Sequence, residues 1–108
     1  MTSPVRKTKK SGLMERPTLS EALAESLAAI AAKHKGGSAE NQRDRIMETL
    51  MTVGAVTTIE IRKHLDVLAP APRILELRRI GKRIATHWVR QATDCGKVHR
   101  VGLYVLES

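Results

Sequence analysis

Residues 72–83 combine basic, acidic and apolar side chains at helical spacing. Winding residues 72–80 as a helix, at about 100° per residue, places Leu75, Glu76 and Arg79 opposite the apolar face. An arginine fork can bind the edge of a guanine, a carboxylate can accept from a cytosine amino group, and a leucine can touch a thymine methyl group. The pattern predicts reading of base edges in a major groove. The alternative is a solvated charged face with one exposed leucine.

Other basic residues suit phosphate contacts, which require only charge and reach. These candidates are Arg78, Lys82 and Arg83 beside the predicted reading face, and Arg90, Lys97 and Arg100 further along the chain. Arg90, Lys97 and Arg100 could instead serve only solubility. Arg73 falls between Leu77 and Ile80, on the packed side of the helix. It could bend outward to a phosphate, or it could pair with Glu60 or Glu48 and hold helices together.

A catalytic or metal-binding role finds less support. Cys95 and His99 lie four positions apart across a predicted turn, and His87 lies on the strand before it. A thiolate nucleophile or a metal site would need an activating partner or further fixed ligands, and the pattern offers neither. The sequence has no glycine-rich phosphate loop and no paired-carboxylate signature. We therefore expect no enzymatic activity, no metal and no cofactor.

The composition favours a polyanionic partner. The chain has 108 residues, with 19 Lys and Arg against 11 Asp and Glu, and a formal net charge of +8. Such a balance predicts binding to nucleic acid. Trp88 and Tyr104 are the only aromatic residues. Proteins that bind single strands stack bases on exposed aromatic rings, so the composition favours a duplex.

The remaining composition bounds where the chain acts. Its single cysteine excludes an internal disulfide and a thiolate zinc cage, which fits a reducing compartment. No apolar stretch approaches the roughly 18 residues that a membrane-spanning helix needs. Glu21 and Glu25 also argue against a membrane-surface role for the segment that contains them. We expect no membrane partner and a cytoplasmic, nucleoid-associated location.

Capping signals and apolar periodicity predict the helices that would position these residues. Thr18-Leu19-Ser20-Glu21 is a Thr-x-x-Glu capping box that opens a first helix, and Gly36-Gly37 stops it. A second helix starts at Ser38 or Asn41 and ends at Gly54. It carries an apolar stripe, which consists of Ile46, Leu50 and Val53.

Two shorter helices follow. Thr57-Thr58-Ile59-Glu60 repeats the capping signal and opens a helix that runs to about Leu65. The next helix begins at Pro70 or Pro72, because proline is tolerated in a first turn, and Gly81 stops it. Its predicted inward residues are Ile74, Leu77 and Ile80.

After Gly81 the apolar period changes to two, which predicts a hairpin. Residues 84–89 alternate as a strand, Asp94-Cys95-Gly96-Lys97 forms the turn, and a second strand covers about 98–106. An isolated hairpin is marginal in water, so it must pack against the helices. We expect the rings of Trp88 and Tyr104 to seal it onto them.

This order describes a winged helix-turn-helix, and residues 42–106 also resemble a known family. They resemble the small winged helix-turn-helix domains of phages and bacterial prophage regions. The motifs are Gln42-Arg43 with Ile46 and Leu50, Thr57-Thr58-x-Glu60, Arg73-Ile74-x-Glu76-Leu77-Arg78, Gly81, Ile84 and Tyr104-Val105-Leu106. The resemblance implies a DNA-binding fold in a bacterial or phage context. The segment before Asn41 lies outside it.

We therefore predict a mainly α (α+β) fold with a three-helix core, a two-stranded wing and an extra amphipathic helix at the N-terminus. Residues 1–17 form a disordered basic arm, 18–37 the extra helix with a glycine hinge, and 38–108 the winged helix-turn-helix domain. The apolar stripe of the extra helix must be buried, either in its own domain or against a second chain. We favour a homodimer, with an interface formed by Leu19, Leu23, Leu27 and Ile30.

Two functions from different classes stay open. The first is a sequence-preferring protein that binds double-stranded DNA, as a phage or prophage transcriptional regulator or a recombination accessory factor. It would read the major groove with residues 72–80 and touch the backbone or minor groove with the 84–106 hairpin. The second is a winged helix that serves as a protein-interaction module, since fold alone does not fix function. The basic residues clustered on the helix and hairpin favour the first.

Overall fold

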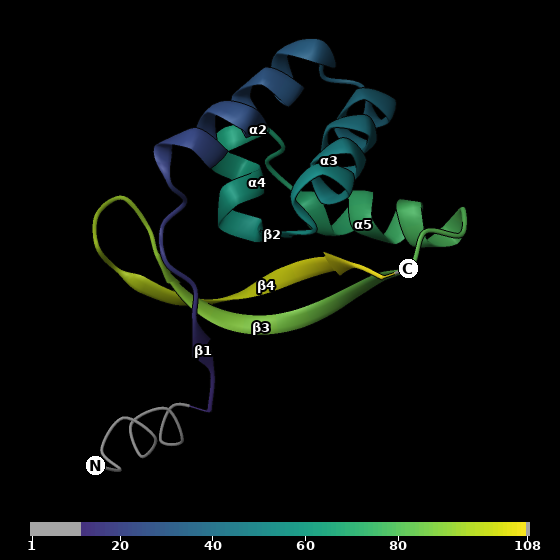
Figure 1. Ribbon diagram of the computed structural model, residues 1–108. Helices are drawn as coiled ribbons and strands as arrows, with labels where there is room; N and C mark the ends of the chain where they lie inside the picture. The colour runs from purple at the N-terminus through teal and green to yellow at the C-terminus, as the bar shows by residue number, and fades with distance from the viewer. Residues whose placement is uncertain (1–11, 108) are drawn as a thin grey trace, which may run out of the picture.

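The computed structural model describes residues 12–107, in which four helices lie to one side of a β-hairpin (Figure 1). The helices are α2 (Glu21–Lys33), α3 (Ala39–Val53), α4 (Thr58–His64) and α5 (Pro70–Arg79). The strands are β1 (Met14–Glu15), β2 (Ala55–Thr57), β3 (Ile84–Ala92) and β4 (Val98–Leu106). This arrangement confirms the predicted α+β class. Most of the predicted basic arm, residues 1–11, lies outside the described residues.

The sheet is larger than the predicted hairpin, with the strand order β1-β3-β4-β2. β3 and β4 pair antiparallel from Ile84–Leu106 to Ala92–Val98, as the alternation predicts. β2 pairs antiparallel with β4, and β1 pairs parallel with β3. Strands of two and three residues are too short to show a period of two, so the pattern could not reveal β1 or β2.

Several helix boundaries follow from local chemistry, as predicted. The hydroxyl of Ser38 caps α3 by accepting from the Asn41 amide at 3.1 Å, and Gly54 ends that helix at φ +87°. Thr57 and Glu60 form a complete capping box at the start of α4. Pro70 occupies the first turn of α5, where its missing N–H costs no helical hydrogen bond.

The predicted capping box at Thr18 is wrong. α2 begins at Glu21, and its cap is Ser20, whose hydroxyl accepts from the Leu23 amide at 3.2 Å. The preceding residues are held against the sheet: the Arg16 amide donates to the Arg90 carbonyl at 2.8 Å. The chain therefore turns into a helix only after it has left the sheet.

Ile80 is also placed differently from the prediction. Its side chain is 67% exposed, whereas Ile74 and Leu77 are buried as expected. α5 ends at Arg79, and Gly81 follows at φ +99° with its amide bonded to the Arg78 carbonyl. The chain turns away at this point, so the helical phase that would have brought Ile80 inward no longer applies.

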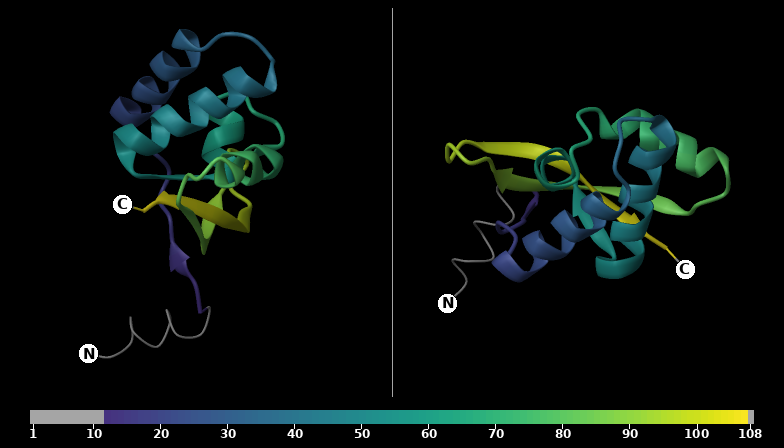
Figure 2. Two further views of the ribbon diagram at one scale, coloured as in Figure 1. Left: turned by 90° about the vertical axis from the view of Figure 1, so that its right-hand side faces the viewer. Right: turned by 90° about the horizontal axis from the view of Figure 1, so that it is seen from above.

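The apolar stripe of α2 packs within its own chain. Leu27 and Ile30 are 1% and 6% exposed, and Leu27 belongs to the same core as residues from all the other helices. Leu19 packs against that core, while Leu23 is 39% exposed. α2 lies alongside α3, from the side and from above (Figure 2). The prediction of a dimer interface is therefore wrong for Leu27 and Ile30, because burial in the chain's own core leaves them no free surface.

The end of α2 is fastened to α3. The buried Arg45 donates to the carbonyls of His34 and Gly36, the latter at 2.9 Å. The side-chain amide of Gln42 donates to the Gly37 carbonyl at 2.9 Å. A helix end with free carbonyls attracts a cation, so the arginine is well placed there. The glycine pair is consequently held by α3, which contradicts the prediction of a hinge.

Replacing Leu27 with alanine tests this packing. We expect Leu27→Ala to lower the free energy of unfolding by about 2–4 kcal/mol, because it leaves a cavity in the core. Leu23→Ala, one turn earlier on α2 and more exposed, should cost less than about 1 kcal/mol. Urea denaturation followed by circular dichroism measures both. Equal and small effects would mean that α2 does not pack in its own chain.

Candidate nucleic-acid interface

α4, the turn 65–69 and α5 form the helix-turn-helix. Leu65 and Val67 are fully buried in the turn, and Asp66 between them adopts a left-handed conformation at φ +55°. The Arg62 guanidinium donates to the Leu68 carbonyl at 2.9 Å. Pro70 is buried at the start of α5. The turn is thus anchored at both ends, which fixes the direction in which α5 leaves α4.

α5 presents two of the predicted reading residues to solvent. Ile74 and Leu77 are buried against the core, whereas Leu75 is 47% exposed. Arg79, one turn after Leu75, is also exposed. Residues four apart lie on the same face of a helix, so these two side chains form one outward surface.

Glu76 lies beside them but is held by two arginines. Its carboxylate accepts from Arg43 of α3 at 2.8 Å and pairs with Arg73 of its own helix at 3.0 Å. Glu76 is also only 33% exposed. A carboxylate so compensated is poorly placed to accept from a cytosine amino group. Its observed contacts instead tie α5 to α3.

Arg73 is therefore in a structural pair, although not with either predicted partner. Glu48 is occupied by Lys33 at 3.0 Å and by His34 at 2.6 Å. Hydrogen bonds from His34 and Lys33 hold the pKa of Glu48 below its ordinary value. Glu60 pairs with Arg16 at 2.9 Å. Glu76 lies one turn away on the same helix and is the acid within reach of Arg73.

The basic residues at the end of α5 and in the loop after it divide into two groups. Arg78 donates from Nε to the Ile84 carbonyl at 2.8 Å and from its terminal nitrogen to the Thr86 hydroxyl at 2.7 Å. These bonds fasten the end of α5 to β3. Lys82 and Arg83 lie in the following loop with exposed side chains. They keep the reach that phosphate contacts need.

The hairpin carries the other predicted basic residues. Arg90 and Arg100 are directly opposite each other on β3 and β4, and Lys97 lies exposed in the turn. Arg90 pairs with Glu15 of β1 at 3.3 Å. Gly96 adopts φ +88°, as the predicted turn requires.

Trp88 does not seal the hairpin, which corrects the prediction. Its side chain is 49% exposed, and the Arg100 guanidinium lies 4.4 Å above the centre of its ring. Tyr104, by contrast, is buried in the core as predicted. The main core cluster takes Ile84 and Tyr104 from the open end of the hairpin, and the buried Val89 lies on the opposite face of β3 from Trp88. Trp88 lies further along β3, beyond the apolar residues that could cover it.

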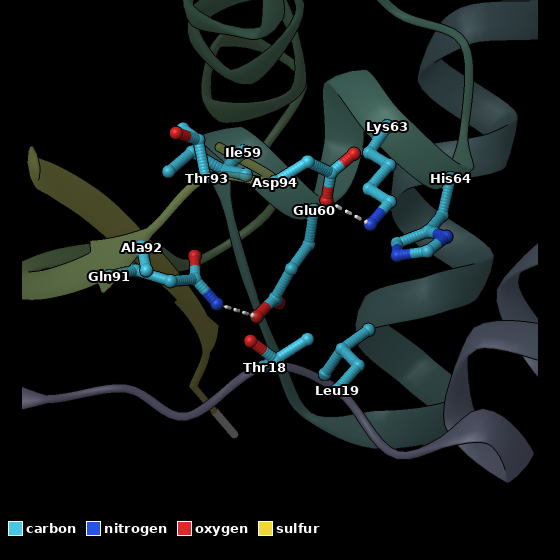
Figure 3. A pocket seen from close by; sticks show the side chains of 10 residues that line it. All are labelled: Thr18, Leu19, Ile59, Glu60, Lys63, His64, Gln91, Ala92, Thr93 and Asp94. Carbon is cyan, nitrogen blue, oxygen red and sulfur yellow. Dashed lines mark hydrogen bonds and ion pairs between the residues drawn. The ribbon is translucent and has the colours of Figure 1, made fainter. Parts of the chain in front are cut away.

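A buried polar network, which the residue patterns did not predict, fixes the hairpin to α4. Glu60 is 3% exposed, and Arg16 donates to both of its carboxylate oxygens at 2.9 Å. Gln91 of β3 donates to Glu60 at 2.7 Å (Figure 3). The Thr57 amide also donates to Glu60, at 3.0 Å. The Thr57 hydroxyl donates to Gln91 at 2.6 Å. The capping box marked Glu60 as a cap, but its distant partners left no local signal.

Beside this network lies a small pocket of about 210 Å³ between α4, the end of β3 and the segment before α2 (Figure 3). At its rim Lys63 of α4 pairs with Asp94 of the hairpin turn at 2.6 Å. This pair is exposed, so it fixes the turn only weakly.

Cys95 is exposed in the hairpin turn, and His87 and His99 are exposed on β3 and β4. Within residues 12–107 no group of three His, Cys, Asp or Glu side chains is placed to hold a metal ion. No helix among the same residues has the length and apolar character needed to cross a membrane.

The family comparison matches the part of the chain that holds these elements. A family model described as a winged helix-turn-helix domain matches residues 41–108. The chain belongs to the winged helix-turn-helix domain family. No curated protein and no solved structure matches it.

Membership of the winged helix-turn-helix family indicates DNA binding. The match includes α4, α5, the hairpin and nearly all of α3. β1 and α2 lie outside the match. Arg16, the partner of Glu60, therefore comes from a segment that the family does not include.

The Glu60 network predicts a specific pH dependence. Burial alone would raise the pKa of Glu60, but hydrogen bonds from Arg16, Gln91 and Thr57 outweigh it and lower the pKa. A lowered pKa in the folded state stabilises the fold above the unfolded pKa of about 4.3, and this stability is lost as the pH falls through the folded pKa.

We therefore expect Glu60→Gln to lower the free energy of unfolding by about 1–3 kcal/mol at pH 7. The difference from the unmodified protein should shrink as the pH falls below about 4.3. Urea midpoints measured between pH 7 and pH 3 give this difference. Glu25→Gln, on the exposed face of α2, is the matched control. A difference that is the same at every pH would contradict the assignment.

Proposed function

We propose that the chain binds double-stranded DNA with sequence preference and reads the major groove with α5. The observation that carries the proposal is the outward face of α5, on which Leu75 and Arg79 lie exposed while Ile74 and Leu77 anchor the helix in the core. An arginine fork suits a guanine edge, and a leucine suits a thymine methyl group. Glu76 is not assigned to base reading, because Arg43 and Arg73 compensate its charge.

Phosphate contacts are assigned to the exposed basic residues around that face. They are Lys82 and Arg83 after α5 and Lys97 and Arg100 on the hairpin, together with the partly exposed Arg90. Arg73 and Arg78 are assigned to holding α5 in place, because their guanidinium groups are engaged by Glu76 and by β3.

The biological role proposed is that of a phage or prophage transcriptional regulator or recombination accessory factor. The resemblance of residues 42–106 to phage and prophage domains supports it. Such a protein would act on DNA in the cytoplasm, in association with the nucleoid, and would need neither catalysis nor a cofactor.

A protein-interaction module is the second candidate, and one observation favours it. Leu68 is 78% exposed and Ile80 is 67% exposed, at the two ends of α5. Exposed apolar side chains of this size can mark a surface for a protein partner. Such a module would have no use for the exposed basic residues beside them, which is why DNA is preferred.

Salt dependence separates the two candidates. If about five to seven phosphates are neutralised, the slope of log K against log salt should be about −5 to −6. Selection of bound duplexes from a random pool, repeated at two salt concentrations, gives both the preferred sequence and the slope. Absence of duplex binding at about 50 mM salt would favour the protein-interaction module.

Three substitutions separate reading from holding. Arg79→Ala should cost about 1–3 kcal/mol on the preferred site and relax its sequence preference, with little change in Tm. Lys82→Ala should weaken binding to all duplexes alike. Glu76→Ala should lower Tm, because it leaves Arg43 and Arg73 without their partner. Binding by fluorescence anisotropy and thermal melting test these outcomes. A lower Tm of Arg79→Ala with an unchanged sequence preference would refute the assigned reading face.

A further inference from the structure

β3 and β4 concentrate positive charge around the exposed tryptophan, beyond the end of the hairpin that enters the core. Side chains two apart on a strand share one face, so Trp88 and Arg90 of β3 lie together, and Arg100 lies opposite Arg90 on β4. Like charges directly opposite each other destabilise a sheet. Arg100 is drawn away over the Trp88 ring, at 4.4 Å from its centre. This exposed patch consists of Trp88, Arg90 and Arg100 and is called the outer wing face. It continues the side of the sheet on which Ile84 and Tyr104 enter the core.

Arg90 is balanced by an acid from the added strand. Glu15 lies in register with Arg90 across the β1–β3 pair, and its carboxylate is 3.3 Å from the Arg90 guanidinium. The two side chains are 69% and 39% exposed, so water and other anions can reach both. An exposed pair of this kind is weak and exchangeable.

The position of Glu15, however, is firmly set. The next residue, Arg16, bonds through its amide to the Arg90 carbonyl at 2.8 Å. Its guanidinium makes two bonds of 2.9 Å to the buried Glu60. A weak acid–base pair is thus held in place by a strong buried one. Strand β1 lies outside the family match, so the Glu15–Arg90 pair is not contained in the matched domain.

The outer wing face is joined to the reading helix. Arg78 at the end of α5 donates to the Thr86 hydroxyl at 2.7 Å. Thr86 precedes Trp88 by two residues on the same strand and therefore shares its face. Arg78 therefore links the end of α5, where the duplex would bind, to the strand that carries Trp88 and Arg90 of the outer wing face.

We propose that the outer wing face binds a phosphate of duplex DNA and that Glu15 competes with this phosphate for Arg90. The proposal rests on the proposed function. In the free protein Glu15 occupies Arg90, and in the complex the phosphate replaces it. Trp88 acts as a positioning residue, because its ring holds the Arg100 guanidinium beside the same phosphate. The N-terminal segment thereby lowers the affinity of the winged helix for DNA.

A double-mutant cycle tests the competition. Glu15→Gln should tighten binding to a duplex about two- to five-fold, because the competitor is removed. Arg90→Gln should weaken binding, and adding Glu15→Gln to it should then give no further gain. Glu25→Gln changes the net charge equally from the exposed side of α2 and should alter affinity by less than about 1.5-fold. An equal gain from Glu25→Gln, or an undiminished gain from Glu15→Gln in the Arg90→Gln background, would overturn the proposal.

Trp88 itself reports the contact, because it is the single tryptophan of the chain. Its fluorescence should change along the same titration curve as the anisotropy of a labelled duplex. Trp88→Leu should weaken binding, and Trp88→Phe should restore part of it by keeping a ring beneath Arg100. Duplex binding with unchanged fluorescence and unchanged affinity of Trp88→Leu would refute the outer wing face while leaving α5 as the reader. Absence of duplex binding by the unmodified protein would instead refute the proposed function.

Discussion

The fold depends on one buried carboxylate that must be compensated on every side. Glu60 is removed from water, and leaving such a charge unpaired would cost several kcal/mol. Its donors come from three separate places in the chain: Arg16 before α2, Thr57 at the start of α4, and Gln91 on β3. Satisfying one charge therefore fixes the N-terminal segment, the helix-turn-helix and the hairpin relative to one another.

Two other acids, Glu48 and Glu76, are likewise paired between elements of the helical layer. Glu48 joins the end of α2 to α3, and Glu76 joins α3 to α5. Both are paired within the helical layer, so they do not offset the charge of Arg79 or Lys82. Folding therefore leaves the positive charges of Arg79 and Lys82 exposed and uncompensated by these two acids. An uneven positive field of this kind attracts a polyanion more strongly at one face than at others.

Local chemistry was readable from the sequence, whereas contacts across the chain were not. The capping box at Thr57, the left-handed glycine at position 54 and the proline at position 70 act within one turn, so residue type alone predicts them. Arg43, which pairs with Glu76, and Arg16, which pairs with Glu60, lie 33 and 44 residues away in sequence, and no local pattern encodes such pairs. Trp88 was misplaced for a related reason: an apolar ring predicts burial only where a neighbouring element covers it.

The segment outside the family match is structurally inseparable from the matched domain. α2 contributes Leu27 to the common core, and the residues before it contribute Arg16 to the Glu60 network. Removing that segment would expose the core and strip Glu60 of its cation, so the domain could not keep its stability unchanged. The same residues place an acid beside the hairpin arginines. On the proposed competition, two neighbouring residues of this segment have opposite effects: Arg16 stabilises the fold, and Glu15 reduces the positive charge that the wing offers to DNA.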